Sequence, residues 1–129
     1  MFLDTSGLLS HQYDSEQAHA KALDLFEASG EKLTHNYILA EFIALVTARR
    51  LHRQKAITFV ENLSLHPLVE VIWVDEALHN RALALLKARQ DKTYSLADAV
   101  SFVLMKERSI TQALTNDHHF EQEGFQCLL

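Results

Sequence analysis

Short apolar runs alternate along this chain with longer segments in which apolar residues recur at helical spacing. A short, continuous apolar run is typical of a strand that is buried on both faces of a parallel sheet. Strands that alternate with helices of about 12 residues indicate βαβ units. The pattern therefore predicts an α/β fold with a central, mainly parallel sheet. The five predicted strands are residues 1–5, 32–34, 69–74, 113–115 and 125–129.

Capping residues and helix breakers mark the ends of the predicted helices. Ser, Asp and Asn favour helix N-termini because their side chains accept the free backbone N–H groups of the first turn. Gly30 is a suitable C-terminal stop for the first helix, and a helix over residues 54–63 ends before Pro67. The predicted N-caps are Asp14, Asn36, Asp75 and Ser95.

Composition narrows the class of protein. The 129 residues are 48% apolar and contain no linker or repeat, so we expect one globular domain over residues 1–129. Three glycines are too few for a glycine-rich phosphate loop, and the single Cys127 excludes an internal disulfide framework. Neither a signal peptide nor an apolar run of about 18 residues is evident, so we expect a cytoplasmic protein without a membrane partner.

Charge alone argues against a nucleic-acid-binding protein with a broad positive surface. The net charge is −5, from 12 basic and 17 acidic residues. That argument weakens if four of the negative charges form a metal site, because the rest of the chain then carries only −1. The positions of four acids suggest such a site.

Two of these acids follow predicted strands, and two interrupt apolar helices. Asp4 ends the first strand and Asp117 follows the fourth, at the sheet edge where α/β proteins bind ligands. Glu41 and Asp98 lie in apolar surroundings, where a carboxylate is costly unless it is paired or bound to metal. Carboxylate oxygens suit Mg²⁺ or Mn²⁺, and these ions can activate water and stabilise an in-line displacement at phosphorus.

Each acid also has a purely structural interpretation. Asp4 can begin an Asp-Thr-Ser-Gly turn, and Asp98 can complete a capping box with Ser95. Asp117 can cap a short helix, and Glu41 can point to water. The combination of four acids across successive βα units favours the metal site over these separate interpretations.

The acids lie in four stretches, which read FLDTSGLL, NYILAEFIALV, TYSLADAVSFVLM and ALTNDHHFEQEGF. These stretches, in this order, resemble the PIN domain family, in particular its VapC-type ribonuclease toxins. The intervening WVDEALHNRALALLKARQDK is also similar to the family, so the resemblance covers essentially the whole chain. It implies a PIN-like α/β/α sandwich around the predicted sheet.

The resemblance also implies a mechanism of metal-assisted RNA hydrolysis. Asp4 and Asp98 would bind Mg²⁺ or Mn²⁺, and Asp117 and Glu41 would complete the site or hold metal-bound water. Activated water would attack the phosphodiester in line, and both one and two ions fit this scheme. The polar residues implied to support these acids are Thr5 or Ser6, and Thr115.

The implied biological role is the toxin of a toxin–antitoxin pair. Its partners would be an RNA substrate, an antitoxin protein that covers the acidic pocket, and a second copy in a homodimer. One alternative is a non-toxic PIN-like module that binds RNA or protein without cleavage, which the complete set of acids disfavours. Another is a phosphatase or receiver-type domain, which needs paired acids after the first strand and a late Lys. Here Asp4 stands alone and no Lys follows Lys106.

Three further features are open to more than one interpretation. The basic cluster over residues 49–55 either compensates a helix dipole or contacts RNA phosphates or an acidic partner segment. The eight His residues lack the H-E-x-x-H spacing of a zinc site, although His118 beside Asp117 can contact RNA or orient water. Trp73 and Phe102 are expected in the core.

Overall fold

Five strands form one sheet in the computed structural model, which describes every residue from 1 to 129. The strand order is β3-β2-β1-β4-β5, and each neighbouring pair is parallel. The predicted α/β class and parallel sheet are therefore confirmed. The strands are β1 (Phe2–Leu3), β2 (Lys32–His35), β3 (Val69–Ile72), β4 (Gln112–Leu114) and β5 (Gln126–Cys127).

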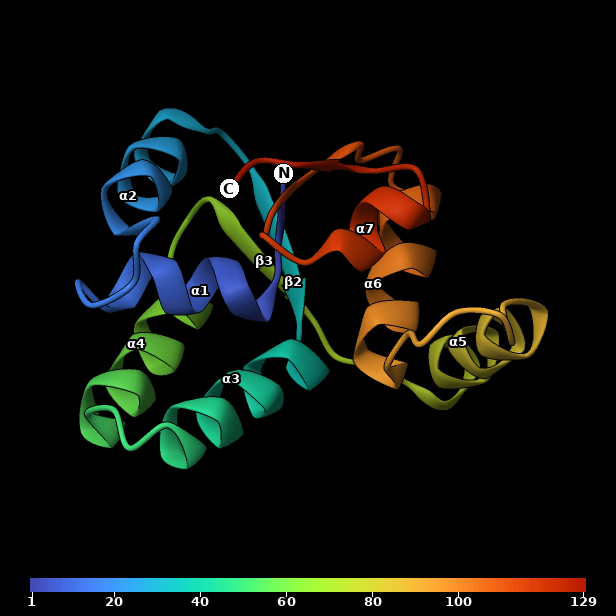
Figure 1. Cartoon of the computed structure of the whole chain (residues 1–129), viewed down its shortest axis with the longest axis horizontal. Helices are drawn as coiled ribbons and strands as arrows, with labels where there is room; N and C mark the ends of the chain where they lie inside the picture. The colour runs from blue at the N-terminus through green and yellow to red at the C-terminus, as the bar shows by residue number, and fades with distance from the viewer.

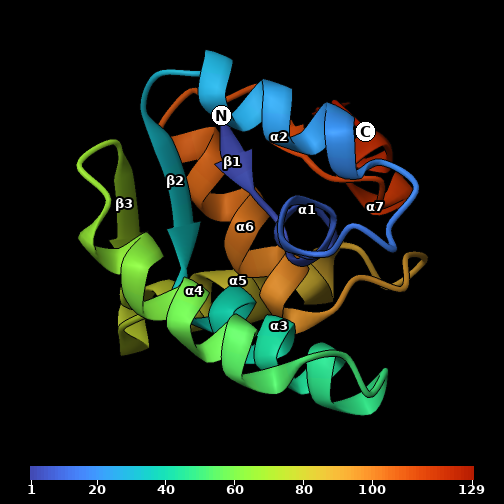
Figure 2. The same cartoon turned by 90° about the vertical axis from the view of Figure 1, so that its left-hand side faces the viewer.

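Seven helices enclose this sheet. They are α1 (Thr5–Gln12), α2 (His19–Ala28), α3 (Asn36–Ala48), α4 (Arg53–Leu65), α5 (Glu76–Ala88), α6 (Leu96–Glu107) and α7 (His118–Gln122). Figure 1 shows α1, α2 and α4 on one side of the sheet and α5, α6 and α7 on the other, while Figure 2 shows β1 and β2 lying in front of α6. This arrangement is the predicted α/β/α sandwich. None of the helices combines the length and the apolar character needed to span a bilayer.

The central strands are buried on both faces. Phe2, Leu3 and Leu114, in β1 and β4, have no exposed surface, as the continuous apolar runs predict. Phe102 of α6 lies edge-on to Phe120 of α7, with ring centroids 4.9 Å apart. This packing anchors the two C-terminal helices beside the strand ends that carry the candidate acids.

The N-terminal helices differ most from their prediction. Strand β1 ends at Leu3, and α1 begins two residues later, within the segment for which the sequence pattern predicts a strand. The next helix begins at His19, so the prediction that Asp14 caps it is wrong. The α1 segment reads TSGLLSHQ, and its Thr, Ser and Gly are poor helix formers. The helix is therefore stabilised by tertiary packing, including its contact with β4, rather than by local helix propensity.

The predictions of the helix caps are correct in part. Asp75 and Ser95 cap α5 and α6 as predicted. The prediction for Asn36 is wrong, because His35 caps α3 through Nδ1, which accepts the backbone N–H of Ile38 at 3.4 Å. The Asn36 side chain instead accepts a backbone N–H beyond β3 at 2.8 Å.

The expectation for the two aromatic residues is also correct only in part. Phe102 is fully buried, whereas Trp73 is 74% exposed. Trp73 follows β3, which is an edge strand of the sheet, so fewer elements surround it than surround a residue of the central strands.

We expect Gly7→Ala to destabilise the fold by about 3 kcal/mol, measured by urea unfolding. A Cβ at position 7 would lie 1.9 Å from the carbonyl oxygen of Leu114, a backbone atom that the sheet holds in place. Gly30→Ala is the matched control, because nothing lies within 4 Å of its Cβ, and we expect it to change stability by no more than about 0.5 kcal/mol. Equal stability of the two variants would contradict the close packing of α1 on β4.

Candidate active site

The structure brings the four predicted acids to one edge of the sheet. Strands β1 and β4 are parallel neighbours, so Asp4, directly after β1, and Asp117, three residues after β4, lie at the same C-terminal edge. Asp98 lies in the first turn of α6, and Glu41 lies in α3. In Figure 1 the N-terminal ends of α1, α3, α6 and α7 approach one another at this edge.

Asp4 is held by a network of hydroxyl groups. Its Oδ2 accepts hydrogen bonds from the Thr115 hydroxyl at 2.7 Å and the Ser6 hydroxyl at 3.1 Å. The two hydroxyl oxygens lie 2.9 Å apart. The backbone N–H of Asn116 donates to the Ser6 oxygen at 3.1 Å, and that of Asp117 donates to the Thr115 oxygen at 3.0 Å. The start of α1 and the segment after β4 therefore position Asp4 together.

Thr5 occupies a different place from Ser6. Its side chain is buried, yet the hydroxyl oxygen has no hydrogen-bond partner. The hydroxyl lies near Glu41, where it lowers the pKa of that carboxyl and so opposes the effect of burial. Of the two alternatives that the sequence leaves open, Ser6 is the one that contacts Asp4, and Thr5 faces Glu41.

Asp98 takes part in a complete capping box. The backbone N–H of Ser95 donates to Asp98 Oδ2 at 2.9 Å, and the Asp98 N–H donates to the Ser95 hydroxyl at 3.0 Å. Burial is the main cause that raises the pKa of Asp98, and the negative charge of Asp117 adds to it. The cap and the acidic cluster are therefore compatible, because Oδ2 serves the cap while Oδ1 makes no hydrogen bond within the protein.

Asp117 shows the same division between its two oxygens. It caps α7 by accepting the backbone N–H of His119 on Oδ1 at 2.9 Å, and Oδ2 makes no hydrogen bond within the protein. Asp4 likewise uses only Oδ2 for its two hydroxyl partners. Each of the three aspartates is thus oriented through one oxygen, while the other makes no hydrogen bond to a side chain.

The sequence interpretation missed His119 and favoured its neighbour. The His118 side chain is 70% exposed, and its Nδ1 is 3.8 Å from Asp117 Oδ1. His119 Nδ1 is buried without an aligned hydrogen-bond partner, 3.0 Å from Asp117 Oδ1 and 3.6 Å from Asp98 Oδ2. His119 Nε2 lies 2.9 Å from the Thr93 hydroxyl. No spacing along the sequence distinguishes His119 from His118, because the difference lies in contacts with Asp98 of α6 and Asp117.

Two buried polar groups away from the cluster hold these helices in place. His35 Nδ1 accepts the backbone N–H of Ile38 and so caps α3. The ring proton is therefore on Nε2, which donates to the Ser101 hydroxyl of α6 at 2.8 Å. Burial lowers the pKa of His35 to about 3, which keeps the ring neutral. Glu123, just after α7, accepts hydrogen bonds from Arg89 and Tyr94. Helices α3, α6 and α7 thus have fixed positions, and so have their acids.

Comparison with known proteins agrees with this geometry. The sequence profile of the PIN domain family matches residues 1–125. The chain belongs to the PIN domain family. The 23S rRNA-specific endonuclease VapC20 of Mycobacterium tuberculosis, strains CDC 1551 and H37Rv, is 29% identical over 126 residues, which cover 97% of this chain and 95% of VapC20.

A solved structure shows the same relationship in three dimensions. The crystal structure of Mycobacterium tuberculosis VapC20, described as a sarcin–ricin loop cleaving toxin, matches with a TM-score of 0.87 at 27% identity. The match covers 97% of this chain and 95% of the VapC20 chain. The shared fold therefore extends over nearly the whole chain.

The donor groups of this PIN domain fit a divalent cation. Asp98, Asp117 and His119 can each offer one ligand atom, all within 4.8 Å of one another. Burial, with added repulsion from Asp98, raises the pKa of Asp4 to about 6. Loss of hydration at its carboxyl group, with repulsion from Asp4, Asp98 and Asp117, raises the pKa of Glu41 to about 7. A bound cation would stabilise the ionised carboxylates, because an opposite charge offsets both effects.

The raised pKa of Asp4 predicts how the metal-free protein responds to pH. Between about pH 4 and pH 6 the folded protein holds a proton on Asp4 that the unfolded chain has lost, so stability falls as pH rises through this range. The loss is at most about 1.4 kcal/mol per pH unit for one group. We expect Asp4→Asn, which carries no titrating group at this position, to lack this contribution.

Urea unfolding of both proteins in EDTA at several pH values measures this difference. Titrating groups that do not interact with Asp4 contribute equally to both proteins. Asp4→Asn also removes the repulsion that helps to raise the pKa of Glu41, which changes the difference in the same direction. Wild type should lose stability relative to Asp4→Asn as the pH rises from 4 to 6. Parallel stability curves for the two proteins over that range would show that Asp4 titrates alike in the folded and unfolded chain.

Proposed function

We propose that this PIN domain is a metal-dependent endoribonuclease and the toxin of a toxin–antitoxin pair. The observation that carries the proposal is the convergence of four acids on one sheet edge, three of them with an oxygen that makes no hydrogen bond to a side chain. The relationship to VapC20, a 23S rRNA-specific endonuclease, extends over 97% of the chain and supports RNA as the substrate. The sarcin–ricin loop that the solved relative cleaves is the first RNA to test.

We assign Asp4, Glu41, Asp98 and Asp117 to the binding of Mg²⁺ or Mn²⁺. When bound, such a cation lowers the pKa of water and offsets the charge that develops on the phosphate oxygens. The hydroxyl groups around Asp4 and the capping box around Asp98 hold the free oxygens of these residues in place, so little rearrangement is needed on binding.

His119 is added to this assignment as a neighbour of the metal. Its Nδ1 faces both Asp117 and Asp98 and makes no aligned hydrogen bond, so it can bind the cation or orient Asp117. An imidazole nitrogen suits Mn²⁺ better than Mg²⁺, which prefers oxygen ligands. We therefore expect Mn²⁺ to bind more tightly of the two.

The remaining parts of the proposal rest on the family relationship. A toxin of this kind acts on cytoplasmic RNA, and an antitoxin protein would restrain it. The homodimer stays a prediction. The alternative of a PIN-like module without cleavage activity is not favoured, because all four acids are present and the related VapC20 is an endonuclease.

We expect the purified protein to cleave RNA with Mn²⁺ or Mg²⁺ and to stop in EDTA. Suitable substrates are 23S rRNA and a hairpin that carries the sarcin–ricin loop, with products resolved on a denaturing gel. Asp117→Asn should lower the cleavage rate by about a hundredfold, because removal of a metal-site carboxylate weakens metal binding and transition-state stabilisation. Asp14→Asn is the control, since it removes the same charge from an exposed turn.

Full cleavage in EDTA by a preparation in which Asp117→Asn is equally active would contradict the metal mechanism. Cleavage that only Asp14→Asn abolishes would place the catalytic site elsewhere. Failure of wild type to cleave any RNA in either metal would favour the binding module.

Expression in a bacterial host should slow growth, and Asp4→Asn should relieve the arrest. The reason is that uncontrolled cleavage of an essential RNA halts translation, whereas a variant without the Asp4 carboxylate lacks part of the proposed metal site. Growth curves at matched soluble expression measure the effect. If wild type and Asp4→Asn are equally harmless at equal levels, the protein is not a toxin in that host.

A further inference from the structure

A basic segment lies at the turn between α3 and α4. Residues 49–55 contain four cations, and no Asp or Glu occurs between Glu41 and Glu61. All four cationic side chains are exposed. Only Arg49 has an acidic partner, Glu16, at 3.3 Å, and half of the Arg49 side chain stays exposed. In a chain with a net charge of −5 this is a local positive surface with little internal neutralisation. The four cations are Arg49, Arg50, Arg53 and Lys55.

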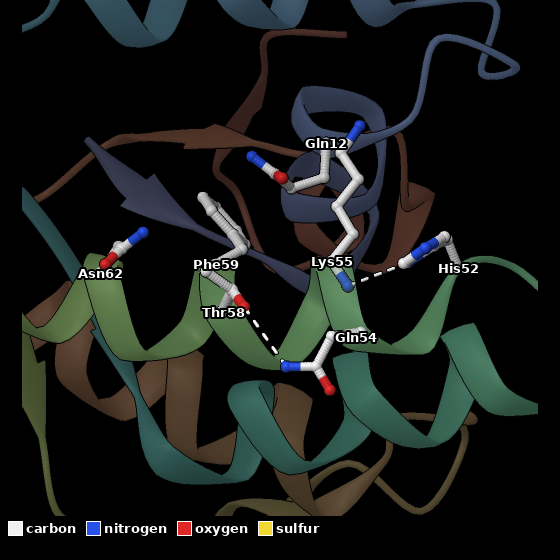
Figure 3. A pocket seen from close by; sticks show the side chains of 7 residues that line it. All are labelled: Gln12, His52, Gln54, Lys55, Thr58, Phe59 and Asn62. Carbon is white, nitrogen blue, oxygen red and sulfur yellow. Dashed lines mark hydrogen bonds between the residues drawn. The ribbon is translucent and has the colours of Figure 1, made fainter.

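The segment borders a groove between the end of α1 and the first turns of α4. Figure 3 shows Lys55 rising from α4 beside Gln12, with Phe59 and Asn62 further along the same helix. The groove is shallow and open to solvent, with a volume of about 370 Å³. Its lining residues are Gln12, His52, Gln54, Lys55, Thr58, Phe59 and Asn62.

Local contacts form this groove in advance of any ligand. The Tyr13 hydroxyl donates to the His52 carbonyl oxygen at 2.8 Å, which joins the end of α1 to the turn. His52 Nδ1 accepts the backbone N–H of Lys55 at 3.1 Å and so caps α4. The Lys55 ammonium lies 5.3 Å from the centre of the Tyr13 ring. The cation is thus held above the groove, while its donors stay available to an anion.

Two helices connect the groove to the carboxylate cluster. Helix α1 follows Asp4 and ends at Gln12, in the groove; helix α3 carries Glu41 and leads to Arg49. Helices α1 and α3 are in contact with each other. Each pair of residues is eight positions apart, which is about 12 Å of helix at 1.5 Å per residue. The basic segment therefore lies a few nucleotides of single strand away from the acids.

We propose that the groove and its basic rim bind the sugar–phosphate backbone of the RNA substrate, beside the scissile phosphate. The inference rests on the proposed ribonuclease function. Cations on the rim contact phosphates, and the amide side chains of the groove offer both donors and acceptors to ribose and base edges. The groove lies about 12 Å of helix from the carboxylates, a position that suits a strand whose phosphodiester enters the proposed nuclease site. This position favours RNA over an acidic protein as the occupant.

Arg50 allows a sharp test, because it adopts a backbone conformation that favours glycine. Its φ is 55°, and the chain forms a Schellman stop there, with Leu51 N–H bonded to the Val46 carbonyl oxygen at 3.0 Å. Ser109 ends α6 in the same way, with φ 54° and the Ile110 N–H bonded to the Met105 carbonyl oxygen at 2.8 Å. Glycine at either position relieves the same strain, but only Arg50→Gly removes a cation.

The experiment compares two pairs of variants, Arg50→Gly with Ser109→Gly and Lys55→Ala with Lys87→Ala. Lys87 is exposed on α5 and has no acidic partner. Binding of a labelled sarcin–ricin hairpin and of labelled poly(U) is followed by fluorescence anisotropy in EDTA at several salt concentrations. Cleavage of the hairpin is measured in Mn²⁺, and thermal melts report stability.

We expect Arg50→Gly and Lys55→Ala to weaken binding of both RNAs severalfold and to lower the slope of log affinity against log salt by about 0.7 each. The KM for cleavage should rise while kcat stays unchanged, because contacts away from the reacting phosphate bind substrate and transition state alike. Ser109→Gly and Lys87→Ala should behave as wild type. Both glycine variants should melt no lower than wild type.

The inference would be overturned if Arg50→Gly and Lys55→Ala had the same RNA affinity and salt dependence as the control variants. So would unchanged RNA binding together with binding of a poly-glutamate peptide that Lys55→Ala weakens, which would identify the groove as a site for an acidic protein. A wild type that binds both RNAs but cleaves neither would contradict the proposed nuclease, while the anisotropy comparison would still decide the role of the groove.

Discussion

The parallel pairing of β1 with β4 determines where every other part of the site lies. These two central strands are two and three residues long, and they pair through Phe2 with Ala113 and Leu3 with Leu114. Because parallel strands end at the same edge, Asp4 and Thr115 meet there, and the hydroxyl of one fixes the carboxylate of the other at 2.7 Å. Gly7 keeps α1 close to β4, since any larger residue would meet the Leu114 carbonyl group.

The acids that this pairing brings together lower the stability of the metal-free fold, and the same negative charges attract a cation. Loss of hydration and mutual repulsion raise the pKa values of the buried Asp4 and the more exposed Glu41 to about 6 and 7. The protein offsets part of this cost with hydrogen bonds to one oxygen of each aspartate, from hydroxyl groups and helix N-termini. The same hydrogen bonds orient the free oxygens, so the features that make the acids tolerable also prepare them to bind metal.

Charge is divided between the two ends of a pair of helices. Helices α1 and α3 carry or follow acids near their beginnings, and the basic segment with its groove lies where they end. This division is compatible with RNA binding by a chain with a net charge of −5. The four acids of the proposed metal site account for −4 of that charge, so the rest of the chain carries −1. An RNA strand that reaches the acids passes from a region of attraction to the place where a cation neutralises the repulsion.

Local sequence predicted the parts of the fold that depend on local physics. The alternation of apolar runs and helical stripes predicted the parallel sheet, because burial on both faces demands continuous apolar strands. The sequence correctly predicts Ser95 and Asp75 as caps, because a capping side chain bonds to backbone groups only a few residues away. The predicted acids Asp4 and Asp117 meet at one edge because strand direction places them there.

Tertiary structure alone decided the rest. Helix α1 consists of poor helix formers and exists because it packs against β4, and His35 displaced Asn36 as a cap because its ring also bonds to Ser101 across the core. Trp73 is exposed because it follows an edge strand, a position that composition does not reveal. His119 joins the acids through distances to residues of two helices, which no spacing along the chain records. Sequence determined which residues are suited to the chemistry, and packing over long separations determined which of them meet.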